Sequence, residues 1–219
     1  MRKPPATRLT NPKAGSRSPR DTWHGGGDIE LHQYARSLQN AAKSLVAKLE
    51  LDRSIRADWD ACPIVLLYRQ SLELNLKMLV GEGSNFLPSP TDPISVFKTT
   101  SLRWLAQIVC QVIRAVKWES EFKCEGVSSL AEFSAVVNEV ESFDPVARAV
   151  RSARTKDPDS VSDYYRTFDI VEFAKKLDAL LGLLDSTADA LAAEWDRRAE
   201  AAAAFSELDG CGDFKPTIQ

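Results

Sequence analysis

The chain has 219 residues, of which 44% are hydrophobic and 27% are charged, and its 31 acidic side chains outnumber its 28 lysines and arginines. This length suits one core and needs no second domain, and no run approaches the roughly 18 apolar residues that cross a bilayer, which argues against a membrane-spanning protein. The four cysteines lie far apart without a C-x-x-C pair, so we expect free thiols, no metal, no cofactor and a cytoplasmic location.

The N-terminal 20 residues are rich in proline, serine and basic side chains and contain no acid, whereas the rest of the chain carries 22 bases against 31 acids. Such a segment buries too little apolar surface to offset the entropy of ordering, so we expect a disordered basic tail. Three consecutive glycines at 25–27 predict a flexible joint. We therefore divide the chain into a tail, residues 1–27, and a single helical domain, residues 28–219. The tail is expected either to contact nucleic acid or to fold onto a partner subunit.

Apolar residues recur at helical spacing from Asp28, a plausible N-cap, to about Glu50, which predicts a first helix. After a charged connection, a second helix is predicted with Pro63 in its first turn and with Gly81 and Gly83 as stop signals. Its apolar residues cover most of its circumference, so we expect it at the centre of the fold.

The segment 84–100 contains three prolines and is predicted to lack regular structure. A third helix is predicted from Ser101 to about Trp118. A fourth begins with the capping pair Ser129 and Glu132 and ends before the Asp-Pro pair at 144–145. Residues 147–165 are compatible with a small hairpin or with a lid loop.

The last predicted helix starts at the capping pair Asp169 and Glu172 and keeps its register for about 35 residues. Its distal part, 199–205, is alanine-rich and has high helix propensity but little apolar area, so we expect it to project or to dock on another chain. The predicted fold class is all-α: an antiparallel helical bundle with a long C-terminal helix and a disordered basic N-terminal tail.

Arg69, Glu73 and Lys77 recur every four residues along the second helix, which places them on one stripe. With Gln70, and with Arg103 facing them from the third helix, they would form a pocket for a phosphate or a nucleotide. The alternative is a structural ladder that fixes helix register, and this is the interpretation that we favour.

A second basic cluster lies at 148–156 and includes Arg151 and Arg154. In a loop these side chains would contact phosphates, but a solvated face that balances the acidic body is an equally good explanation.

Residues 63–77 read Pro-Ile-Val-Leu-Leu-Tyr-Arg-Gln-Ser-Leu-Glu-Leu-Asn-Leu-Lys, and a later helix contains Leu-Arg-Trp-Leu at 102–105. Together with Asp-Thr-Trp at 21–23 and Tyr-Ala at 34–35, these motifs resemble the bacterial HEPN-like proteins, over about residues 21–198. The resemblance implies a bundle that dimerises or joins a larger complex of the kind found in toxin–antitoxin and defence systems. In active members it also implies a metal-independent ribonuclease, in which an arginine is followed within four to six residues by a histidine.

This chain departs from that motif, because both of its histidines, His24 and His32, precede the core helices. Gln70 and Thr100 stand where the resemblance would place histidines, and neither residue takes up a proton near pH 7. We therefore expect a non-catalytic interaction subunit that acts as a homo-oligomer or through a partner protein. The alternative is a ribonuclease-type effector that uses Arg69, Glu73, Lys77, Arg103 and Arg151, with Glu73 as proton acceptor. A third possibility is a stand-alone bundle without a ligand.

Overall fold

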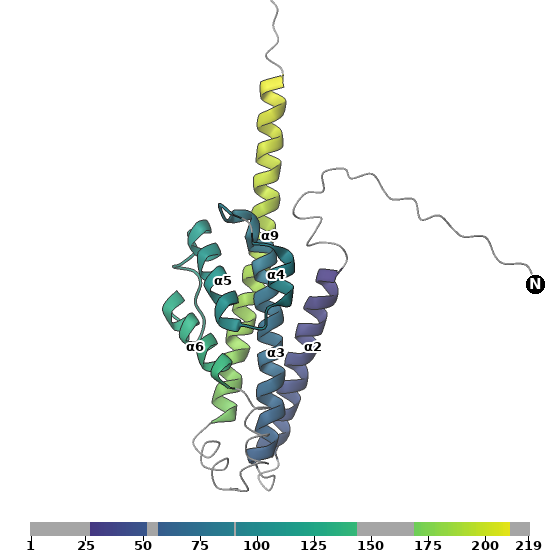
Figure 1. Cartoon of the computed structure of the whole chain (residues 1–219), viewed down its shortest axis with the longest axis vertical. Coiled ribbons are helices and arrows are strands. Elements are labelled where there is room, and N and C mark those ends of the chain that lie inside the picture. The colour runs from purple at the N-terminus through teal and green to yellow at the C-terminus, as the bar shows by residue number, and fades with distance from the viewer. Residues whose placement is uncertain (1–26, 52–56, 90, 144–168, 211–219) are drawn as a thin grey trace, which may run out of the picture.

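The computed structural model describes residues 27–51, 57–89, 91–143 and 169–210, and its regular elements within these ranges are all helices (Figure 1). In chain order they are α2 (Gly27–Leu51), α3 (Ala57–Gly83), the short 3₁₀ helix η1 (Ser84–Phe86), α4 (Pro93–Lys98), α5 (Leu102–Val116), α6 (Leu130–Ser142) and α9 (Ile170–Gly210). The predicted all-α bundle with a long C-terminal helix is confirmed. The predicted basic tail lies outside the described residues.

The second predicted helix is central, as expected, because α3 packs against α2, α4, α5 and α9. Its fully buried side chains form the middle of the core and include Tyr68, Leu72, Leu76 and Leu79. The position predicted for Pro63 is wrong. The helix starts at Ala57, so Pro63 is its seventh residue and removes one backbone hydrogen bond from its interior. Packing along the rest of α3 tolerates that loss.

The C-terminal end of α3 comes very close to α5. A Cβ atom built on Gly83 would overlap both methyl groups of Val112, so this glycine is needed for the close approach of the two helices. The predicted stop at Gly83 is confirmed, and η1 follows directly.

The prediction that 84–100 lacks regular structure is wrong, because α4 lies inside it. Asp92 caps this helix by accepting hydrogen bonds from the backbone N–H groups of Ile94 and Ser95, and Pro93 occupies the first helical position. An acidic N-cap followed by proline is a strong helix start. Six residues were too few for the periodicity of the sequence to show it.

Side-chain caps set the starts of α5, α6 and α9 close to the predicted positions. Ser101 Oγ accepts from Trp104 N–H, Ser129 Oγ accepts from Glu132 N–H, and Asp169 Oδ1 accepts from the N–H groups of the second and third residues of α9. The Glu132 carboxylate reaches back to the N–H and hydroxyl of Ser128, one residue before the N-cap. These hydrogen bonds lower the pKa of Glu132.

Helix α9 has 41 residues and is longer than the bundle that it packs against. Its first half is buried through Phe173, Leu177, Leu184 and Leu191, whereas Ala199 and residues 201–204 are exposed. Figure 1 shows this distal part, at the yellow end of the colour scale, continuing beyond the other helices. Among the described helices, none combines the length and the apolar character needed to span a bilayer.

Candidate functional site

The predicted ladder on α3 forms with the expected pairing. Lys77 Nζ lies 2.7 Å from Glu73 Oε1, and a guanidinium nitrogen of Arg69 lies 3.5 Å from Glu73 Oε2. The side chains of Glu73 and Lys77 are only 6% and 9% exposed. One buried carboxylate is thus held between two cations, as the four-residue spacing predicts.

The two cations of the ladder also bind backbone carbonyls of the neighbouring segment. Lys77 Nζ donates to the carbonyl oxygen of Phe97 at 3.1 Å, and Arg69 Nη2 donates to that of Thr100 at 3.3 Å. Phe97 is in the last turn of α4, where carbonyls lack helical partners and a cation is favourable. The ladder therefore fastens α4 and the start of α5 to α3.

This geometry limits the chemistry available at the ladder. The ribonuclease alternative needs Glu73 to approach a substrate hydroxyl to within about 3 Å. Glu73 is buried, and its oxygens already face Arg69 and Lys77. Each cation contacts Glu73 and donates to one backbone carbonyl oxygen of the protein. The contacts that the structure shows are those of a structural ladder.

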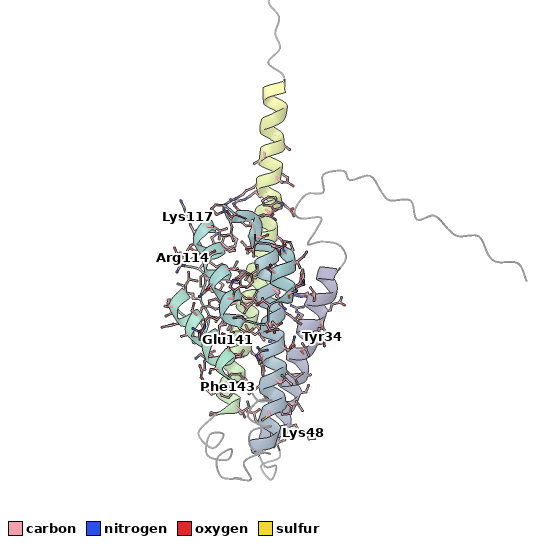
Figure 2. The ribbon with its side chains drawn as sticks, in the orientation of Figure 1. Tyr34, Lys48, Arg114, Lys117, Glu141 and Phe143 are labelled. Carbon is pink, nitrogen blue, oxygen red and sulfur yellow. The ribbon has the colours of Figure 1, made fainter. Side chains whose placement is uncertain are left out.

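Arg103 makes its contacts on α6 instead of on the ladder. Its Nε donates to Asn138 Oδ1 at 2.9 Å and lies 3.6 Å from Glu141, whose other oxygen accepts from Ser101 Oγ. Glu141 is thus tied to the N-cap of α5, and Figure 2 labels it on α6. The spacing of residues in the sequence predicts neighbours within one helix. It could not predict that Arg103 pairs with residues of α6.

The remaining predicted contacts are only partly placed by the structure. Gln70 is half-buried on α3, next to Arg69. Arg151 and Arg154, together with the rest of the 148–156 cluster and the proposed hairpin or lid, lie outside the described residues, as does the basic tail. The described part of the chain therefore brings Arg69, Glu73 and Lys77 together and leaves Arg103 with α6.

His32 lies on α2, and its Nδ1 is 3.1 Å from the carboxylate of Asp185 on α9, which also accepts a hydrogen bond from Arg36 at 2.9 Å. Two turns further along α2, Gln39 donates a hydrogen bond to Asp178 of α9 at 2.7 Å, and Lys43 lies 3.4 Å from the same carboxylate. The α2–α9 contact is thus lined by polar pairs. Across the described ranges, no group of histidine, cysteine and acidic side chains is arranged to hold a metal ion.

Tyr68 is a buried polar group that the sequence analysis did not single out. Its hydroxyl has no hydrogen-bond partner of normal geometry within the described part of the chain, and its ring packs edge-on against Phe173 at 6.1 Å between centroids. Burial, together with the nearby Asp178 carboxylate, raises the pKa of Tyr68 far above its ordinary value. The only signal in the sequence was a single phenol inside an apolar run.

A groove of about 210 Å³ lies between α6 and the first turns of α9. Val136, Val140, Phe173 and Leu177 make its apolar wall, and the ion pair between Lys176 and Glu139, with 3.8 Å between nitrogen and oxygen, crosses its rim. The other two lining residues are Asp169 and Glu172, at the start of α9, and the groove by itself indicates no reaction.

Comparisons with protein families, with curated proteins and with solved structures found no match to this chain.

Proposed function

We propose that this chain is a non-catalytic, HEPN-like interaction subunit of a bacterial defence or toxin–antitoxin assembly, which acts by oligomerisation or by binding a partner protein. The observation that carries the proposal is the distal part of α9. Ala199–Ala204 are exposed on a helix that continues beyond the bundle. An isolated helix of this length is marginal in water, and a surface of this kind gains stability when another chain covers it.

The ladder on α3 also supports the proposal of a non-catalytic subunit. Its buried charges satisfy each other and two backbone carbonyls, so α3 needs no ligand to explain them. The sequence motifs that resemble HEPN-like proteins are thus retained as the scaffold of the bundle. The histidine that the nuclease motif requires after Arg69 is absent from the sequence.

The test is the light-scattering mass of the full chain and of a chain ending at Arg198, each with and without a short mixed RNA whose integrity is then read on a gel. We expect a dimer or larger species for the full chain, a smaller species for the shortened chain and intact RNA throughout. A full chain that is monomeric and recruits no purified candidate partner would contradict the proposal. So would RNA cleavage that is lost in Arg69→Ala.

A further inference from the structure

Helix α9 passes from buried to exposed over a short stretch. Leu191 is fully buried, Glu194 and Trp195 are half-buried, and residues 196–204 are all exposed. Figure 1 shows the helix continuing beyond the other helices. We call residues 192–204 the outer part of α9. The packing that holds this part in place must therefore lie near Trp195.

At this point α9 contacts Phe86, the last residue of η1. The rings of Phe86 and Trp195 are nearly perpendicular, at 86°, with 5.9 Å between their centroids. One turn further along α9, the guanidinium carbon of Arg198 lies over the Phe86 ring, 4.9 Å from its centroid. Edge-to-face aromatic pairs and cations over aromatic rings are both attractive arrangements. Phe86 thus contacts two residues that lie one turn apart, and we call Phe86, Trp195 and Arg198 the Phe86 clamp.

A carboxylate on the same helix orients Arg198. The Nε atom of Arg198 donates to Glu194 Oε1 at 2.7 Å, and the other oxygen of Glu194 accepts from Arg197. Arg197 and Arg198 therefore share one partner, and both side chains are exposed. Arg198 differs because it also lies over Phe86. This difference allows the effect of the clamp to be separated from the effect of the ion pair.

The end of α3 fixes the position of Phe86 in turn. Ser84, the first residue of η1, is buried, and its hydroxyl donates to the carbonyl oxygen of Gly81 at 3.0 Å. The short helix packs on both α3 and α5. Because Gly83 lies directly against Val112, η1 cannot shift without disturbing the contact between α3 and α5. The Phe86 ring is therefore held by a well-packed part of the bundle.

A helix end that extends beyond a bundle frays from its terminus, because a short isolated helix is marginal in water. Fraying of the outer part of α9 should stop at the first point where the rest of the chain holds it. We infer that this point is the Phe86 clamp, and that η1 thereby sets the direction in which the outer part of α9 leaves the bundle. This is a property of a single copy, so it goes beyond the proposed function.

Hydrogen exchange tests the clamp in the full protein at a concentration where it is monomeric. Arg198→Gln removes the cation over Phe86. Arg197→Gln is the matched control, because it removes the same charge and a bond to the same carboxylate. We expect the amides of residues 192–198 to exchange about threefold faster in Arg198→Gln than in Arg197→Gln.

A second variant removes both contacts of the clamp. Phe86→Ala should speed the exchange of the same amides about tenfold. Phe97→Ala removes an exposed phenyl ring from α4 and is its control, which should leave these amides unchanged. The amides around the buried Leu76 on α3 show whether Phe86→Ala weakens the whole bundle. If they exchange faster by the same factor, the comparison of the two arginine variants decides.

Two results overturn the inference and leave the proposed function standing, because neither depends on association. One is equal exchange of residues 192–198 in the two arginine variants, and the other is exchange in Phe86→Ala that matches the unchanged protein. Light scattering then tests the proposed function separately. If the outer part of α9 carries the self-association, Phe86→Ala should associate only at a higher concentration than the unchanged protein. Faster exchange with unchanged association confirms the clamp and contradicts the proposed contact on α9.

Discussion

Helix α3 and the distal part of α9 both depart from the usual distribution of side chains, in opposite directions. The middle of α3 buries Ser71, Glu73, Asn75 and Lys77, whereas the distal part of α9 exposes a run of alanines. Every one of those four polar groups on α3 has a partner within the chain. The comparison teaches that one helix can be stabilised by burial and by polar groups paired within the chain, while the exposed end of another depends mainly on helix propensity.

The largest effect is expected from removing the central charge of the ladder. Glu73→Leu leaves Lys77 buried without its carboxylate, and we expect the free energy of unfolding to fall by about 3 kcal/mol. Glu73→Leu combined with Lys77→Met removes both charges and should recover most of that loss. Urea unfolding of the three proteins measures this. A double variant as unstable as the single one would contradict a self-contained ladder. Arg103→Ala, which breaks an exposed pair, is the control and should cost less than about 1 kcal/mol.

The next effect comes from the close approach of α3 to α5. In an open helix, glycine to alanine stabilises by about 1 kcal/mol, but Gly83→Ala would push against Val112 and should destabilise by about 1–3 kcal/mol. Gly182 on α9 has no atom within 4 Å of a Cβ position, so Gly182→Ala is the matched control and should stabilise. Urea midpoints that move in the same direction for both substitutions would show that α3 and α5 do not pack tightly at Gly83.

A smaller effect is expected at Tyr68, the polar atom of α3 that has no good partner among the described residues. Tyr68→Phe removes a buried, unpaired hydroxyl and should raise the free energy of unfolding by about 1 kcal/mol at neutral pH. Because the pKa of Tyr68 is raised in the folded protein, only the unfolded chain loses this proton just above about pH 10. The stability of the unchanged protein should therefore fall there, and the advantage of Tyr68→Phe should grow. An advantage that shrinks with rising pH would contradict this.

The smallest effect on global stability is expected at the end of α9. Ala202→Gly costs about 1 kcal/mol of local helix stability. A loss of about 1 kcal/mol raises the population of the locally open state roughly fivefold. The amides of residues 199–204 should therefore exchange roughly five times faster in hydrogen-exchange experiments at a concentration where the protein is monomeric. The urea midpoint should not move. If the midpoint falls, the distal helix contributes to the bundle of a single copy, and the contrast with α3 is weaker than the structure indicates.

Much of this fold could be predicted from the sequence, because caps and periodicity act locally. Ser101, Ser129 and Asp169 each cap the helix that was predicted to follow. The contacts within the ladder were also predictable, since a spacing of four residues brings side chains together on one helix.

What could not be predicted depends on distances between helices. The partners of Arg103 on α6 and the carbonyls that bind Arg69 and Lys77 are set by how α4, α5 and α6 pack on α3. Helix α4 is too short for periodicity to predict, although Asp92 and Pro93 mark its start. Proline favours the first turn of a helix, but in α3 Pro63 lies in the interior, where packing overrides that preference.

Because α9 is one continuous helix, it fixes the distance between its two ends. From Glu172, beside the groove between α6 and α9, to Ala204 there are 32 residues of uninterrupted helix, which correspond to about 48 Å at 1.5 Å per residue. A straight helix transmits orientation as well as distance, and each residue added or removed turns one end relative to the other by about 100°. Whatever contacts the far end of α9 is therefore held at a fixed distance and angle from the base of the bundle.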